Sequence, residues 1–136
     1  MILRQRIART RDRDLWLWCI DHLEGPIPHP DFDDNGCTCA PDYMLVTGEA
    51  IWPACRTHDW HYSGQHNEPT LTRAEADRRF RINIYRVLRH QGANRIRAAY
   101  YALIYWRAVV RLGARHFTPY TPPEPPDEPY ILPRAA

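Results

Sequence analysis

Apolar residues recur at helical spacing in four segments of the chain, and turn-forming residues separate these segments. The first predicted helix covers residues 15–23, with Asp14 as its N-cap and Gly25 as its stop. Its apolar and aromatic side chains share one face, which we expect to pack in the core. The residues of this face are Leu15, Trp18, Cys19, His22 and Leu23. Residues 25–36, rich in Pro, Gly and Asp, are predicted to form a loop.

Three further helices follow, so the predicted fold class is mainly α. The second helix begins near Trp52, because Pro53 suits a first helical turn, and it runs to about Ser63. The third begins after Thr72, where the sequence Thr-Arg-Ala-Glu forms a capping box, and continues to about residue 90. The fourth covers about residues 93–117 and is rich in Tyr and Trp. The two last helices are long and adjacent in the chain.

The composition divides the chain into three parts. With 136 residues, the chain fits one domain with a single core. Residues 1–13 form a basic N-terminal arm or a ragged first helix, and residues 14–117 form the helical domain. Residues 118–136 contain seven Pro and are predicted to be an extended or disordered tail that docks a protein partner.

Charge is distributed unevenly along the chain. All 18 basic residues are Arg, and eleven of them lie between Arg73 and Arg115, a stretch that holds only two acids. Such a basic stretch suits an anionic partner, although a solvated helix face is the simpler explanation of the charge. No nucleic-acid-binding motif accompanies it, so the sequence does not favour a nucleic-acid partner.

The sequence leaves the location of the protein undetermined. No segment is long and apolar enough to cross a membrane, and the basic start of the chain lacks the features of a signal peptide. The four Cys nevertheless suit an oxidising compartment if they form disulfides. An extracellular or virion-associated protein is therefore favoured on the condition that a disulfide forms.

The segment from Cys55 to Tyr62 places a histidine beside an aspartate on the second helix. Residues four apart stack along one helix face, so His58 should lie next to Tyr62 and Cys55 next to Asp59. Asp59 points about a quarter-turn away from His58. One side chain can therefore take a proton while its neighbour binds a hard cation.

A neutral imidazole is the usual general base near neutral pH, and it needs a partner that orients the ring. Asp77 on the third helix is the candidate partner of His58, although an acid near a helix N-terminus is also favourable by itself. Asp59 is the candidate ligand of Ca²⁺, which prefers six to eight oxygens. The irregular segment 35–42 is a candidate source of further oxygens.

Three motifs in this order resemble the phospholipase A2 superfamily, which includes secreted, prokaryotic and parvoviral enzymes. The sequence Cys55-x-x-His58-Asp59-x-x-Tyr62 resembles the active-site helix of that family. Gly36-Cys37-Thr38-Cys39 resembles the start of the calcium loop in the secreted enzymes. Ala76-Asp77-x-x-Phe80 resembles the second-helix motif of the parvoviral and prokaryotic forms. The resemblance covers about residues 35–85.

The resemblance implies a small α-helical hydrolase in which two long antiparallel helices carry the active site. His58 would activate a water that attacks the sn-2 ester of a glycerophospholipid, Asp77 would hold the imidazole, and Tyr62 would support that network. Ca²⁺ would be bound by the Asp59 carboxylate and by loop groups near Thr38, Ala40 and Asp42. A disulfide between Cys39 and Cys55 would join the loop to the helix.

The loop departs from the family pattern after Cys39. The secreted enzymes have a Gly-rich loop, whereas this chain reads Ala40-Pro41-Asp42. Either the loop takes another path, with the Asp42 carboxylate or the acids of residues 31–34 as ligands, or calcium binds weakly. Cys19 and Cys37 are candidates for a second disulfide, whose connectivity the sequence does not determine.

The partner implied by the resemblance is a phospholipid membrane surface. Seven aromatic residues are candidates for an apolar channel and for a rim that contacts lipid, with Arg residues facing anionic headgroups. They are Trp16, Trp18, Trp60, Tyr100, Tyr101, Tyr105 and Trp106. Packing in the core is the simpler explanation for any one of them.

Two other functions remain open from the sequence. Cys37, Cys39, Cys55 and His58 could form a structural zinc site, which would leave Asp59 and Asp77 without a role. Alternatively, the chain could be a structural component of a phage-like particle that keeps the phospholipase A2 architecture with little activity.

Overall fold

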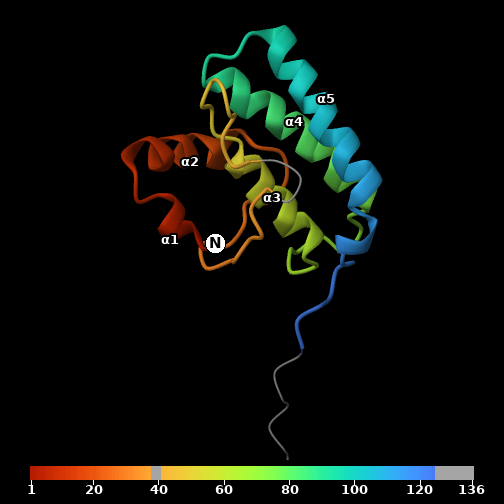
Figure 1. Ribbon diagram of the computed structural model, residues 1–136. Coiled ribbons are helices and arrows are strands. Elements are labelled where there is room, and N and C mark those ends of the chain that lie inside the picture. Colours follow the sequence, from red (N-terminus) through yellow and green to blue (C-terminus); the bar gives the residue numbers. More distant parts are fainter. Residues whose placement is uncertain (38–40, 125–136) are drawn as a thin grey trace, which may run out of the picture.

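The computed structural model describes residues 1–37 and 41–124, and this part of the chain is mainly helical (Figure 1). The order of elements is α1 (Leu3–Arg6), α2 (Thr10–His22), α3 (Trp52–Tyr62), α4 (Arg73–His90), α5 (Arg95–Leu112) and the short 3-10 helix η1 (Ala114–His116). The described residues contain no strand, only an isolated bridge between Tyr43 and Ala50.

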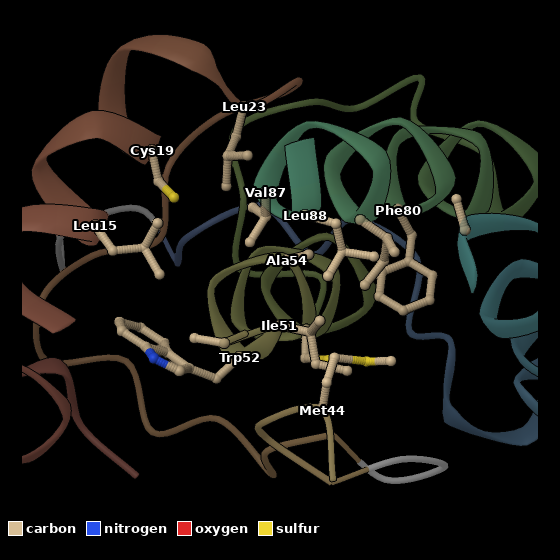
Figure 2. Close-up of a cluster of buried hydrophobic side chains, with 14 of the residues drawn as sticks. Leu15, Cys19, Leu23, Met44, Ile51, Trp52, Ala54, Phe80, Val87 and Leu88 are labelled. Atoms are coloured by element: carbon tan, nitrogen blue, oxygen red, sulfur yellow. The ribbon is translucent and has the colours of Figure 1, made fainter. Parts of the chain in front are cut away.

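Helix α4 lies between α3 and α5 and packs against both (Figure 1). Its core-facing residues recur every three or four positions, so one stripe of the helix is buried. Figure 2 shows Phe80, Val87 and Leu88 of α4 gathered around Ala54 of α3. The start of α3 therefore packs on the second half of α4, and His58, later in α3, meets Asp77 and Phe80 in the first half of α4.

Helix α2 closes the other side of the core. Leu15, Cys19 and Leu23 are buried, as their spacing predicted, whereas His22 is exposed. The helix begins at Thr10 and not after Asp14, so the prediction of its start was wrong. Tertiary contacts explain the extension, because the buried Asp12 accepts hydrogen bonds from Tyr43 Oη (2.9 Å) and Trp52 Nε1 (3.2 Å).

The predicted starts of α3 and α4 are confirmed. Pro53 occupies the first turn of α3. The Thr72 side chain accepts a hydrogen bond from the Glu75 amide at 3.2 Å and caps α4. Helix α5 is shorter than expected at both ends: Asn94 caps its start, and Gly113 separates it from η1.

Both ends of the described chain contact the helical domain. Residues 1–13 contain α1 and the start of α2, and Leu3 belongs to the core. At the other end, the Thr118 and Thr121 amides donate hydrogen bonds to the carbonyls of Tyr62 (2.7 Å) and Gly64 (3.1 Å). The first residues of the predicted tail are therefore held against the end of α3. Residues 125–136 lie outside the described part.

Candidate functional site

Helix α3 positions the side chains of the site. All residues from Ile51 to His58 are buried, so the helix passes through the core and has little freedom to shift. His58 and Tyr62 stack along one face as their spacing predicted, with ring centroids 4.2 Å apart. Asp59 lies next to them and faces the same cavity as His58.

Helix α4 brings a carboxylate to the imidazole. His58 Nε2 lies 2.9 Å from Asp77 Oδ1, and these side chains are 7% and 3% exposed. The Tyr62 hydroxyl donates a hydrogen bond to the same carboxylate oxygen. Phe80, one turn further along α4, packs on the imidazole with ring centroids 4.5 Å apart. The three predicted catalytic residues are thus in contact with one another.

Burial sets the protonation state of this histidine. Desolvation lowers the pKa of His58 below its usual value, and the neighbouring Asp77 opposes that shift. The imidazole is therefore neutral at pH 7. Because Asp77 accepts at Nε2, the proton of the neutral ring is assigned to Nε2 and Nδ1 carries the lone pair. This tautomer is the one that a general base requires.

A cavity of about 450 Å³ lies over the imidazole. One wall is apolar and comes from α4 and α5, with Phe80, Tyr105, Val109 and Leu112. The opposite wall is the loop that contains Asp33, Asn35, Gly36 and Cys37. Its mixed lining suits a ligand with a long apolar part and a polar group near His58 and Asp59.

Asp59 fits the role of a cation ligand. Burial and the nearby Asp34 raise the pKa of the Asp59 carboxyl to about 7. One of its oxygens accepts a hydrogen bond from the Asn35 amide at 3.0 Å, so the loop before Cys37 lies directly against it. A carboxylate that is both desolvated and close to a second acid would be stabilised by a bound cation.

Of the other predicted calcium ligands, Asp42 is the one that lies among the described residues. Its carboxylate forms an ion pair with Arg6 and accepts the Cys37 amide at 3.3 Å. Thr38 and Ala40 lie outside the described residues. In the part of the chain that the structure describes, no three His, Cys, Asp or Glu side chains come together as a metal-binding cluster. Of the two predicted ligands that the structure describes, Asp59 is the one whose surroundings favour a cation.

The disulfide joins the loop to α3 through a different cysteine from the one expected. Cys55 pairs with Cys37, so the predicted Cys39–Cys55 bond was wrong. The bond from Asn35 to Asp59 holds this stretch against α3, and the bond from Cys37 to Asp42 braces it from within the loop. They bring the Cα of Cys37 to 5.3 Å from that of Cys55.

The Cys37–Cys55 bond also bears on the two other predictions that involve cysteines. Cys19 is a buried free thiol, so the second disulfide considered for Cys19 and Cys37 is also wrong. The bond between Cys37 and Cys55 removes two of the four ligands of the alternative zinc site.

Sequence reasoning missed Arg56, which organises the loop beside the site. Its guanidinium is completely buried and donates to the carbonyls of His29 (2.9 Å) and Phe32 (2.8 Å) and to Asp34 Oδ2 (2.8 Å). One signal in the sequence could have revealed the role of Arg56. It is a charged residue between two core-facing positions of α3, and a cluster of acids lies in the preceding loop. Arg56 thereby positions the segment that lies against Asp59.

The aromatic residues expected at a lipid-facing rim lie in different parts of the structure: some in the core, some at the cavity and some on the surface. Trp16 is buried and stacks on Trp52 at 5.6 Å, so it belongs to the core. Tyr105 lines the cavity, and Tyr100 is 58% exposed on α5. Trp18 stacks between His22 and His90, at ring-centroid distances of 4.3 and 3.9 Å.

Helix α5 presents exposed apolar side chains, of which Leu112 also lines the cavity. They are Ile96, Tyr100, Leu103, Ile104, Val110 and Leu112. The same helix carries four Arg and no acid. Among the helices that the structure describes, none combines the length and the apolar character that a membrane crossing requires.

Comparisons of this chain with protein-family models, with curated proteins and with solved structures find no match.

Proposed function

We propose that this protein is a calcium-dependent phospholipase A2-like hydrolase that cleaves the sn-2 ester of glycerophospholipids. The observation that carries the proposal is the hydrogen bond between His58 Nε2 and Asp77 at the base of a largely apolar cavity. A neutral, oriented imidazole beside an apolar slot suits the activation of water towards a lipid ester. The fold that this implies, with α3 and α4 carrying the site, is part of the proposal.

In this mechanism His58 Nδ1 takes a proton from a water as the water oxygen bonds to the ester carbonyl carbon. Asp77 stabilises the resulting imidazolium through Nε2, and the Tyr62 hydroxyl holds the carboxylate in place. The imidazolium then returns the proton to the leaving glycerol oxygen as the ester bond breaks. The products are a fatty acid and a lysophospholipid, and no acyl-enzyme forms.

Asp59 would hold the Ca²⁺ that this chemistry calls for, together with oxygens of the adjacent loop. When bound, the ion would supply positive charge for the substrate phosphate and for the oxyanion that develops at the carbonyl. Asp33, Asn35 and Gly36 line the cavity on the same side as Asp59 and bring polar groups to this end of the slot.

The membrane surface is the proposed partner, and α5 is its contact face. Its exposed apolar residues would enter the lipid interface while the arginines of the helix meet anionic headgroups. The Cys37–Cys55 disulfide supports an oxidising location, such as an extracellular or virion-associated one. A protein partner for the Pro-rich tail, for example on a phage-like particle, also remains a proposal.

Release of fatty acid from mixed phospholipid vesicles tests the proposed activity. We expect release from the native chain with Ca²⁺, and its loss with a chelator or in His58→Ala. Equal release under all three conditions, or none under any, would contradict the proposal. Thermal unfolding of His58→Ala serves as the control for folding.

One observation favours a second candidate, a structural component with this architecture and little activity. Asp42, expected near the calcium site, is instead paired with Arg6. A chain in which neither Asp59→Asn nor His58→Ala alters any lipid-dependent readout would fit this second candidate.

A further inference from the structure

The chain that follows α5 crosses the end of α3 and contacts Tyr62. The Phe117 ring packs edge-on against the Tyr62 ring, with centroids 5.3 Å apart and planes at 81°. The Thr118 amide donates to the Tyr62 carbonyl at 2.7 Å, and the Thr121 amide donates to the Gly64 carbonyl at 3.1 Å. The first of these bonds satisfies a carbonyl that the end of α3 would otherwise leave without a partner.

Gly113 lies directly over the Tyr62 hydroxyl. A Cβ at this position would stand 2.7 Å from the hydroxyl oxygen and 2.5 Å from the Val109 carbonyl oxygen. The φ of Gly113 is −82°, so its backbone conformation does not demand glycine. The lack of space demands it: a side chain here must displace the Tyr62 ring or the last turn of α5.

The Tyr62 hydroxyl has a direct effect on the pair that carries the proposed function. It donates to Asp77 Oδ1, the same atom that lies 2.9 Å from His58 Nε2. The Tyr62 ring also packs on the imidazole. A displacement of Tyr62 therefore alters both the carboxylate and the ring that it orients.

We propose that Gly113 and residues 117–121 are positioning elements that hold Tyr62 on Asp77 and thereby set the geometry of His58. An effect of these residues on hydrolysis rests on the proposed function. Their effect on the contacts among Tyr62, Asp77 and His58 does not. Gly113 and Thr118 also line the cavity, so the same residues that hold Tyr62 border the space over the imidazole.

A double-mutant cycle separates this role from a general effect on folding. The variants are Gly113→Ala, Tyr62→Phe and the double variant, and the readout is the downfield proton NMR signal of His58 Nε2–H at pH 7. We expect Gly113→Ala to shift or broaden this signal. In the Tyr62→Phe background, which lacks the hydroxyl, the same substitution should change the signal by less than half as much.

Ala114→Ser, at the exposed neighbouring position, is the matched control and should leave the signal unchanged. An unchanged signal in Gly113→Ala, or an equal change with and without the hydroxyl, would overturn the proposal. If Gly113→Ala does not fold, Phe117→Leu takes its place in the cycle, with the same expected and contradicting results.

Kinetics on phospholipid vesicles give the second readout. We expect Gly113→Ala to lower kcat about tenfold, which corresponds to about 1.4 kcal/mol, with KM within twofold. A native chain without hydrolytic activity would refute the proposed function, while the NMR cycle would still decide the positioning role. A rise in KM with unchanged kcat would count against positioning of the base.

Discussion

His58 and Asp77 are separated by 19 residues, yet the imidazole Nε2 lies 2.9 Å from a carboxylate oxygen in a buried setting. The packing of α4 on α3 produces this contact. A buried carboxylate near an imidazole is costly unless it is hydrogen-bonded, and here both His58 and Tyr62 satisfy it. This relationship supports the first prediction.

Asp77→Asn should lower fatty-acid release about a hundredfold or more, because a neutral amide cannot stabilise the imidazolium. The matched control is Glu75→Gln, which removes an acid two residues away that pairs with Arg78 on the surface. Steady-state hydrolysis of vesicles is the measurement. Equal losses in both variants would show that the effect comes from α4 and not from the site.

Calcium binding should release a proton near pH 6.5. The pKa of Asp59 is raised to about 7, so the free carboxyl is mostly protonated there and must ionise to bind the ion. Affinity should therefore fall as the pH drops below 7. Calorimetry in two buffers of different ionisation enthalpy measures the released proton. Asp59→Asn should abolish it, whereas Asp31→Asn, an exposed acid in the same loop, should not.

The α5 face should bind anionic vesicles better than zwitterionic ones, and salt should weaken that binding. Each Arg near an anionic surface contributes about 1 kcal/mol, so Arg107→Gln should weaken binding roughly fivefold. Arg78→Gln is the control, because Arg78 lies on α4 and is paired with Glu75. Sedimentation of vesicles gives the affinity. Identical binding to both lipid classes would exclude this face as an anionic-lipid site.

His61 should make the fold less stable in mild acid. It is fully buried, and desolvation lowers its pKa from 6.5 to about 4. The unfolded state therefore binds more protons between these values, and the free energy of unfolding falls as the pH drops through them. The contribution is at most about 3 kcal/mol.

Urea unfolding of the native chain and of His61→Gln at pH 7 and pH 5 measures this effect. The native chain should lose more stability than the variant between the two pH values. The raised pKa of Asp59 acts in the opposite direction, but it is common to both proteins and cancels in the difference. A larger loss in His61→Gln would contradict the assignment.

The helices and the stacking of Tyr62 on His58 could be predicted because local signals determine them. The contact of His58 with Asp77 depends on the packing of α4 on α3, and only the family resemblance led us to expect it. Pro53 and the capping box at Thr72 indicate where α3 and α4 begin. A spacing of four residues places Tyr62 under His58 wherever that segment is helical. The start of α2 could not be predicted in this way, because the contacts of Asp12 with Tyr43 and Trp52 are distant in sequence.

The loop beside the site escaped prediction for the same reason. The choice of Cys37 over Cys39 depends on amide bonds to Asp59 and Asp42, which no local pattern encodes. The pairing of Asp42 with Arg6 joins residues 36 positions apart. Side chains that look like metal ligands in the sequence are therefore assigned to structural roles only once the chain has folded.

Arg56 has a consequence for how this protein can vary. Its guanidinium recognises backbone carbonyls at positions 29 and 32, which every amino acid possesses. The exposed side chain at position 29 is thus open to substitution, whereas insertion or deletion of a residue between the two positions would move the carbonyls out of reach. We expect natural variants of this loop to differ in identity and to agree in length.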